Sequence, residues 1–377
     1  MNSIYTHETT CRSCGSARLD TILAFGETPL ADRLLTATQL EQPEYKAPLT
    51  LAFCADCGLA QILETVDPEI LFYAEYPYFS SVSPSLLRHF GASAEYIMET
   101  KALDESSLVM EAASNDGYML RNFKARGIPV LGIDPSKAPA TKAQEEGIPT
   151  LITFFGATLP SNWWRKAARR RLPGQQCAGP RPRSQRVCST IATVLKDDGV
   201  AVIEAPYVVD LVDHGEFDTI YHQHLCYYSV TALDRLFRRH GLYFNDVKRV
   251  AIHGGSLRMF VGKHEDVQPA VHTLLAEEQE RKVDRIDFYQ DFAEQVRSIK
   301  EGLLAILDEL KGQGYRIAGY GAAAKATTLM SYCGVDKRYL DYVVDLNKYK
   351  HGRFMGGNHL EILPRPRSSW TARPTTR

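Results

Sequence analysis

Two short cysteine motifs in the first 60 residues have the spacing of a metal site. Cys11 and Cys14 form the first pair, Cys54 and Cys57 form the second, and a glycine follows each pair directly. Four thiolates suit a tetrahedral zinc ion, and the glycine allows the strained backbone of the turn. Because no histidine or open ligand position is implied, we expect a structural zinc ion. The alternative is four unrelated buried or redox-active cysteines.

The 39 residues between the two pairs (15–53) exceed the usual spacing of a zinc ribbon. A small sheet must therefore fill the gap, and we expect the segment K-A-P-L-T-L-A-F-C (46–54) to pair with L-D-T-I-L-A-F-G (19–26). A domain of this size needs its metal ion in order to fold.

The segment E-A-A-S-N-D-G (111–117) follows a short apolar run and precedes an amphipathic helix. This order predicts the carboxyl end of the first strand of an open parallel sheet, where α/β folds bind ligands. A dinucleotide fingerprint needs three glycines, and only one is present. An acidic strand end suits a ligand with cationic groups, such as S-adenosylmethionine, although an ordinary helix start capped by aspartate is the alternative. The candidate cofactor residues are Glu111, Ser114, Asn115, Asp116, Gly117 and, at the end of the next strand, Asp134.

The motif Tyr221-His222-Gln223-His224 brings two imidazoles close to several phenols. Imidazole can accept a proton near neutral pH, and a tyrosine can orient or stabilise an enolate oxygen. Two histidines at this spacing on a strand would face one side and could bind a metal ion. Since no third ligand lies at a telling spacing, we favour a general base over a metal site, with a structural histidine cluster as the alternative.

Three further segments could bind a sugar or a phosphate group. The aromatic segment E-Y-P-Y-F-S-S (75–81) precedes a helix that we expect to begin at Pro84, although it could equally pack into the core. The segments H-G-G-S-L-R (253–258) and G-Y-G-A-A-A-K (319–325) are compatible with phosphate, although G-x-G alone is a weak signal whose conventional interpretation is a nicotinamide domain. The candidate substrate residues are Tyr78, Ser80, Ser81, His253, Arg258 and Lys325.

These motifs lie on a pattern of alternating strands and helices that begins near residue 106. The pattern predicts a βαβ unit over residues 108–136, a helix and a strand over 190–206, and a helix followed by two strands over 232–262. Residues 265–311 are helical in pattern, and 315–347 predict a second α/β unit. The fold class is therefore α/β.

The overall composition is that of an ordinary globular protein, with 44% apolar and 24% charged residues, which argues against a disordered or fibrous chain. The chain has no run of eighteen apolar residues, and its first residues lack the features of a signal peptide. We expect a soluble cytoplasmic protein with reduced cysteines.

Two segments differ from the rest of the chain in composition. Residues 158–189 and the tail 364–377 together carry twelve Lys or Arg, no Asp or Glu, and all three tryptophans. A basic arm or a linker would be the usual interpretation. Because both segments begin abruptly within periodic sequence and are rich in Arg, Pro, Ala and Gly, we favour translation in a shifted reading frame. We therefore expect residues 158–189 to form an irregular exposed loop that leaves the sheet without its fourth strand, and the tail to be disordered.

Taken together, the motifs resemble those of the S-adenosylmethionine-dependent C-methyltransferases that act on nucleotide-linked 4-keto deoxysugars. The cysteine motifs, E-Y-P-Y-F-S-S, E-A-A-S-N-D-G-Y-M-L, D-T-I-Y-H-Q-H, H-G-G-S-L-R and G-Y-G-A-A-A-K occur in the order of that family. The resemblance implies a zinc-binding domain (1–72), a class I methyltransferase domain with a Rossmann-like sheet (73–262), and a C-terminal Rossmann-like domain (263–377). It also implies S-adenosylmethionine and a structural zinc ion as cofactors, a nucleotide-linked keto-sugar as substrate, and no nucleic acid or membrane partner. The oligomeric state stays open, a monomer being one possibility.

Carried over by motif, the resemblance implies that His224 is the base that removes the proton beside the ketone. Tyr221 and Tyr76 would lie near the reacting carbon, and His222 is the next candidate for the base. Gln223 occupies a position that is Glu in many relatives, and residues 158–189 lack the family's cofactor-lining segment. Two rival functions are a non-catalytic relative that binds zinc and a nucleotide-sugar, and a nicotinamide-dependent oxidoreductase.

Overall fold

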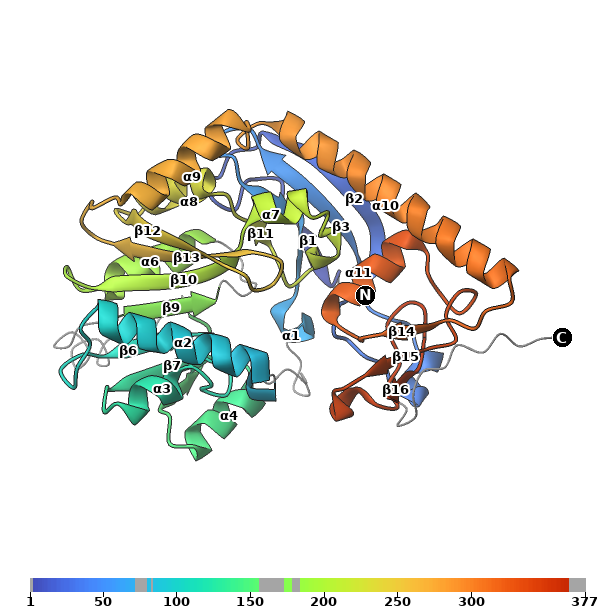
Figure 1. The fold of residues 1–377 in the computed structure, drawn as a ribbon, viewed down its shortest axis with the longest axis horizontal. Coiled ribbons are helices and arrows are strands. Elements are labelled where there is room, and N and C mark those ends of the chain that lie inside the picture. Colours follow the sequence, from blue (N-terminus) through green and yellow to red (C-terminus); the bar gives the residue numbers. More distant parts are fainter. Residues whose placement is uncertain (1–2, 72–79, 83, 156–172, 178–183, 366–377) are drawn as a thin grey trace.

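The computed structural model of the chain describes residues 3–71, 80–82, 84–155, 173–177 and 184–365. Within these ranges the main sheets are a small antiparallel sheet near the N-terminus, a seven-stranded sheet in the middle of the chain and a three-stranded parallel sheet near the C-terminus. Figure 1 shows the N-terminal strands β2 and β3 beneath the long helix α10, with the other two sheets on either side.

The N-terminal sheet is built around a long antiparallel pair, β2 (Leu19–Pro29) and β3 (Lys46–Cys54), as the sequence predicts. In β3, Leu49, Leu51 and Phe53 alternate along the strand and are at most 2% exposed, so one face of the strand is a hydrophobic core face. The fourth strand, β11 (Cys226–Tyr227), lies far along the chain, just after the Tyr221–His224 motif, and pairs with β4 (Ala60–Ile62). The remaining N-terminal elements are β1 (Tyr5–His7), η1 (Ala37–Glu41), β5 (Glu64–Val66) and α1 (Pro68–Leu71).

The central sheet has the strand order β12-β13-β10-β9-β6-β7-β8. Its five strands from β10 to β8 are parallel, and β13 runs antiparallel to both of its neighbours. All four residues of β6 are buried, as expected of a strand covered on both faces. The strands are β6 (Val109–Ala112), β7 (Val130–Asp134), β8 (Thr150–Ile152), β9 (Pro173–Cys177), β10 (Val200–Pro206), β12 (Tyr243–Val250) and β13 (Ser256–Gly262).

Helices and short turns connect these strands, and their ends follow local sequence signals. The helix α8 begins after Ser229, whose hydroxyl oxygen accepts a hydrogen bond from the backbone N–H of Ala232 at 3.0 Å. The elements are η2 (Ser80–Val82), α2 (Pro84–Thr100), α3 (Leu120–Ala125), α4 (Lys137–Glu145), α6 (Ser184–Val194), α7 (Val208–Asp213), η3 (Phe217–Thr219) and α8 (Val230–Arg238).

The C-terminal region consists of two helices followed by a small α/β unit. Its helix α10 packs on the N-terminal sheet, where the ring of Tyr289 lies 5.1 Å from that of Phe53, and in α11 the ring of Tyr332 lies 5.2 Å from that of Phe25. The elements are α9 (Pro269–Glu280), α10 (Ile286–Gly312), β14 (Ala318–Tyr320), α11 (Ala324–Cys333), β15 (Tyr342–Asp345), η4 (Lys348–Lys350) and β16 (Ile362–Pro364).

The prediction of an irregular loop throughout residues 158–189 is wrong for two parts of this segment. Residues Pro173–Cys177 form β9, which pairs in parallel with β10 and β6 and supplies the missing strand of the sheet, and α6 begins at Ser184. The sequence of β9, P-G-Q-Q-C, carries no charge, so the strand includes none of the basic residues of the segment. The rest of the segment and residues 366–377 of the tail lie outside the described residues.

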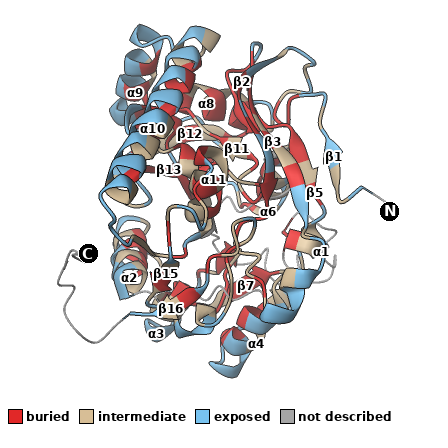
Figure 2. Cartoon of the chain, turned by 90° about the vertical axis from the view of Figure 1, so that its right-hand side faces the viewer, coloured by how far each residue is buried: buried red, intermediate tan, exposed pale blue. Residues whose placement is uncertain are grey.

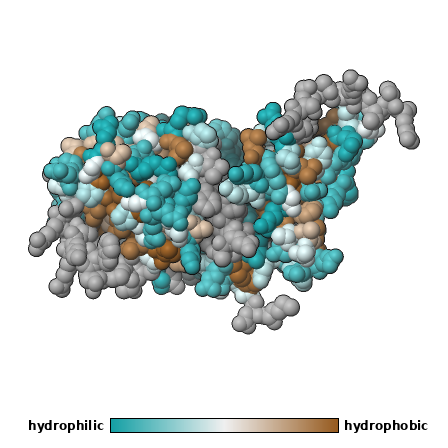
Figure 3. Space-filling model, turned by 90° about the horizontal axis from the view of Figure 1, so that it is seen from below, coloured by the Kyte–Doolittle hydropathy of each residue, from teal (hydrophilic) through white to brown (hydrophobic). Residues whose placement is uncertain are grey.

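The face of the molecule drawn in Figure 3 is largely hydrophilic. Figure 2 shows the strands as mostly buried and the outer faces of α9 and α10 as exposed, and the face in Figure 3 carries hydrophobic residues in small groups among hydrophilic ones. Among the helices that the structure describes, none has the length and apolarity needed to cross a membrane.

Candidate active site and metal centre

The four N-terminal cysteines lie together, as the sequence predicts. Their Sγ atoms are all within 4.8 Å of one another, with 3.5 Å between Cys11 and Cys57 and 3.6 Å between Cys14 and Cys54. Four sulfur atoms bound tetrahedrally to zinc at about 2.3 Å would be separated by about 3.8 Å. The donor set and its spacing therefore fit a zinc ion.

Each cysteine pair is shaped by its own turn. In the first, the backbone N–H of Ser13 points at the Sγ of Cys11 at 3.3 Å, and the N–H of Gly15 donates to the carbonyl of Cys11 at 2.9 Å. Gly15 and Gly58 have φ angles of 79° and 75°, a conformation that glycine adopts at little cost. The second turn joins β3 to β4, so the metal centre lies at the end of a hairpin in the sheet.

The candidate cofactor motif (111–117) forms a tight turn after β6, here called the cofactor turn, and brings three buried carboxylates together. The backbone N–H of Asn115 donates to Asp134 Oδ2 at 2.9 Å, and the N–H of Ser136 donates to Oδ1 at 2.7 Å. Glu111 is 1% exposed, and burial raises its pKa well above the ordinary value, with the charges of Asp134 and Asp116 acting in the same direction. A cation at this site would relieve that repulsion.

The same turn has polar groups without a partner in the described part of the chain. These are Glu111 Oε2, the hydroxyl of Ser114 and both carboxylate oxygens of Asp116. Buried acceptors of this kind are costly unless a ligand supplies donors. The site therefore fits a ligand with an ammonium group and hydroxyls, which S-adenosylmethionine has.

Sequence reasoning missed two features that shape this turn. Gly132 in β7 makes room for the turn, because a Cβ atom there would lie 2.5 Å from the Ser114 hydroxyl. Ala113 has a φ of 58°, a conformation that only the folded turn reveals. The backbone N–H of Ser80 also donates to Asn115 Oδ1 at 2.9 Å, which brings one predicted substrate residue to the cofactor turn.

His224 lies in a turn after η3, with its ring 4.1 Å from that of Tyr221. Its Nδ1 lies 2.9 Å from the carbonyl oxygen of Thr219. A carbonyl can only accept, so Nδ1 carries the proton and the lone pair of the neutral ring is on Nε2. Burial lowers the pKa of His224 to about 4, against the Thr219 hydrogen bond, and the charges of His253 and Lys325 also lower it. The ring is therefore neutral and able to accept a proton at physiological pH.

Comparison with known proteins agrees with this geometry. Residues 11–72 match a zinc binding domain, residues 87–246 a methyltransferase domain and residues 251–374 the C-methyltransferase C-terminal domain. The C-methyltransferase NovU from Streptomyces niveus is 31% identical over 356 residues, which cover 93% of this chain and 84% of NovU. The chain belongs to this C-methyltransferase family. It is therefore a methyltransferase that uses S-adenosylmethionine and has a zinc-binding domain, which excludes the oxidoreductase alternative.

Solved structures of other methyltransferases are similar to about half of the C-methyltransferase chain. An S-adenosylmethionine-dependent methyltransferase from Clostridium acetobutylicum is 10% identical, covers 47% of this chain and 91% of its own, and has a TM-score of 0.37. Magnesium protoporphyrin IX methyltransferase from Synechocystis with bound SAH is also 10% identical, covers 47% and 83%, and has a TM-score of 0.36.

The structure does not place His222 beside His224, contrary to its prediction as an alternative base. Residues 221–224 form a turn, not a strand, closed by the His224 N–H donating to the Tyr221 carbonyl at 2.8 Å. The two imidazoles therefore have different partners, and His222 Nε2 donates to the carbonyl oxygen of Pro48 at 2.8 Å. The side chain of Gln223 lies 3.4 Å from the Ala31 carbonyl, so neither residue reaches the ring of His224.

Arg258 is likewise not an exposed cation for a phosphate group. It is 4% exposed, and its Nε donates to Glu204 on β10 at 2.6 Å. His89 and Ser93 also contact Glu204, at 2.8 and 3.4 Å. Although burial alone would raise the pKa of Glu204, the His89 hydrogen bond and the Arg258 charge hold it below the ordinary value. Sequence patterns did not predict this network, because its members lie far apart in the chain.

Carboxylates of the protein itself lie against both glycine motifs of the C-methyltransferase. A Cβ atom on Gly254 would overlap the carboxylate of Glu216, which also lies 3.8 Å from Lys325 Nζ. In the C-terminal unit, the carboxylate of Asp345 accepts hydrogen bonds from the backbone N–H groups of Ala322 and Asn347 at 2.8 and 2.7 Å. The predicted residues His253 and Lys325 remain within electrostatic reach of His224, whereas Tyr76 and Tyr78 lie outside the described residues.

The metal centre generates the first prediction. Replacing Cys14 by serine removes one of four thiolate ligands, so we expect zinc content to fall below one ion per chain and stability to fall by more than about 4 kcal/mol. Metal analysis and thermal melting measure the two effects. Cys333→Ala is the control, because Cys333 is a buried thiol in α11, outside the metal cluster. Stoichiometric zinc and an unchanged melting temperature in Cys14→Ser would contradict the assignment.

The cofactor turn generates the second prediction. We expect Asp116→Asn to weaken S-adenosylmethionine binding roughly 10- to 100-fold, because it removes a buried charge whose oxygens need donors from a ligand. Isothermal titration calorimetry measures the affinity. The matched control is Asp104→Asn, an exposed carboxylate at the other end of β6. Equal affinity of the two variants would place the cofactor elsewhere.

Proposed function

We propose that this C-methyltransferase transfers a methyl group to the carbon beside the ketone of a nucleotide-linked 4-keto deoxysugar, with His224 as the base. The observation that carries the proposal is the fixed tautomer of His224. The Thr219 carbonyl holds the proton on Nδ1, so the lone pair on Nε2 can accept the substrate proton. The neighbouring ring of Tyr221, tilted by 35° to the imidazole, restricts the orientation of His224.

The reaction requires a carbon acid, a base and a methyl donor. A proton beside a ketone is acidic enough for an oriented imidazole if the developing enolate oxygen is stabilised. Bound S-adenosylmethionine supplies an electrophilic methyl group for the enolate carbon. We assign two groups to the substrate side of His224. Lys325 Nζ supplies a positive charge, and the phenol of Tyr221 supplies a hydrogen bond.

The replacement of a family glutamate by Gln223 does not remove the partner of the base. The Gln223 amide is directed to the Ala31 carbonyl, and the Thr219 carbonyl orients His224. This geometry favours an active enzyme over a non-catalytic binding protein. We further propose that residues 1–72, 73–262 and 263–377 are the zinc-binding, methyltransferase and C-terminal domains, with the nucleotide-sugar between the last two.

The test is exchange of the substrate proton with deuterated solvent. We expect His224→Asn to lower the exchange rate roughly 10²- to 10⁴-fold, the contribution of a general base, while calorimetry shows an unchanged affinity for S-adenosylmethionine. His240→Asn is the control, because His240 lies at the far end of α8. Exchange at the wild-type rate in His224→Asn would exclude His224 as the base, and lack of exchange in the wild type would exclude the keto-sugar.

The low pKa of His224 predicts an unusual pH profile. Only the neutral ring can accept a proton, so kcat/KM for exchange should stay constant from about pH 8 down to about pH 5 and fall tenfold per unit below about pH 4. Circular dichroism at each pH identifies the range in which the fold persists. A profile that falls with an apparent pKa near 6.5 would show that His224 is not shielded from solvent in the working enzyme.

A further inference from the structure

The segment 220–227, here called the base loop, carries His224 but is held mainly by other parts of the chain. Its hydrogen bonds to the N-terminal region involve the side chains of His222 and Gln223 and the backbone of Leu225. A further one, from Thr328 in α11, reaches the Ile220 carbonyl. The bonds are His222 Nε2 to Pro48 O at 2.8 Å, Gln223 Nε2 to Ala31 O at 3.4 Å, Ile62 N to Leu225 O at 3.1 Å, and Thr328 Oγ1 to Ile220 O at 2.8 Å.

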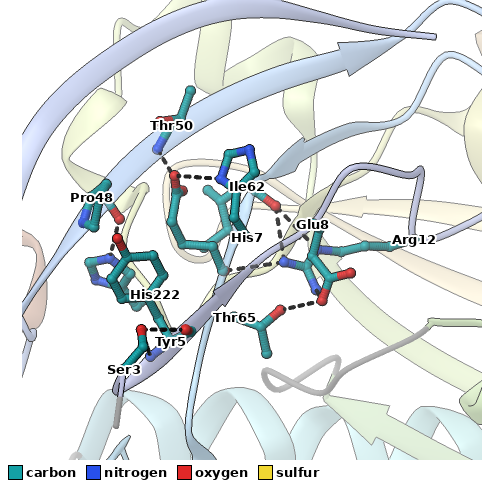
Figure 4. Close-up of polar contacts among 11 residues, drawn as sticks. Ser3, Tyr5, His7, Glu8, Arg12, Pro48, Thr50, Ile62, Thr65 and His222 are labelled. Carbon is teal, nitrogen blue, oxygen red and sulfur yellow. Dashed lines mark hydrogen bonds and ion pairs between the residues drawn. The ribbon is translucent and has the colours of Figure 1, made fainter. Parts of the chain in front are cut away.

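His222 is one of the most deeply buried of these anchors. Its side chain is directed at β3 and donates to the Pro48 carbonyl (Figure 4), and the residue is 1% exposed. Its Nδ1 is buried and has no partner in the described part of the chain, and burial lowers the pKa of the ring. His222 therefore stays neutral and acts as a donor to the N-terminal sheet, not as a base.

The strand that His222 binds leads directly to the metal centre. β3 ends at Cys54, and β4 begins three residues after Cys57, so the second cysteine pair forms the turn of the β3–β4 hairpin. His222 binds one strand of this hairpin, and β11 pairs with the other. A metal ion that fixes the turn would fix both surfaces against which the base loop lies.

We propose that this hairpin is part of the catalytic apparatus and that His222 is the positioning residue through which it sets the orientation of His224. The inference rests on the proposed function, because it takes His224 to be the base. The hydrogen bond to Pro48 fixes the residue two positions before His224, and the β11–β4 pairing fixes the residues two and three positions after it. Both sides of the base are thus held by the N-terminal sheet.

The test compares a substitution that removes the donor with one that keeps it. His222→Met has a similar volume but cannot donate, and we expect it to lower kcat for proton exchange roughly 10- to 100-fold, since small misplacements of a base are costly. KM, zinc stoichiometry and calorimetric S-adenosylmethionine affinity should stay within about threefold of the wild type. His222→Gln places an amide donor near the position of Nε2 and should restore kcat to within about threefold.

A second measurement reports on the base without turnover. In histidine-labelled protein, the imidazole resonance of His224 should shift in His222→Met and return toward the wild type in His222→Gln. The control is His7→Met, because His7 is an exposed imidazole of the same region that lies 3.7 Å from Glu64. Its kcat and the His224 resonance should not change.

The outcomes separate this inference from the proposed function. Wild-type exchange that is lost in His224→Asn but kept in His222→Met would overturn the positioning role and leave the base assignment intact. If His222→Met does not fold, the comparison passes to His222→Asn, whose amide is too short to reach Pro48. Equal kcat in the Asn and Gln variants would also overturn the inference.

Discussion

Four sulfur atoms held within 4.8 Å of one another are the constraint on which the rest of the molecule depends. As thiolates they repel one another. A bound dication removes that repulsion and cross-links the two cysteine pairs. The cross-link lies at the turn of the β3–β4 hairpin, whose sheet accepts β11 and packs beneath α10 and α11. The metal centre therefore organises contacts among three regions of the chain.

Burial acts in opposite directions at the two halves of the active site. At the cofactor turn it raises the pKa of Glu111, and in the base loop it lowers the pKa of His224. Each effect disfavours the charged form of the side chain in the free protein. The carbonyl of Thr219, a fixed dipole, then determines which nitrogen of His224 carries the proton.

Patterns along the chain predicted what depends on local spacing. These include the cysteine cluster, the pairing of β2 with β3, and the acidic turn after β6. They did not predict that the two imidazoles diverge, because the turn at residues 221–224 depends on contacts with distant parts of the chain, nor that Arg258 is paired with Glu204 on the neighbouring strand. The strand β9 was missed because its residues have little β propensity, and its neighbours in the sheet determine its conformation.

The pairing of β11 with β4 has a consequence for building hybrid enzymes from relatives. The chain crosses from one structural unit into another and back again, so a unit of exchange cannot be a single continuous stretch of sequence. A graft of residues 87–246 alone would place the base loop of one parent against the N-terminal sheet of the other. The residues that meet at this contact would then come from two different proteins. Recombination that keeps residues 11–72 and 220–227 from one parent preserves the contact and leaves the cofactor turn free to vary.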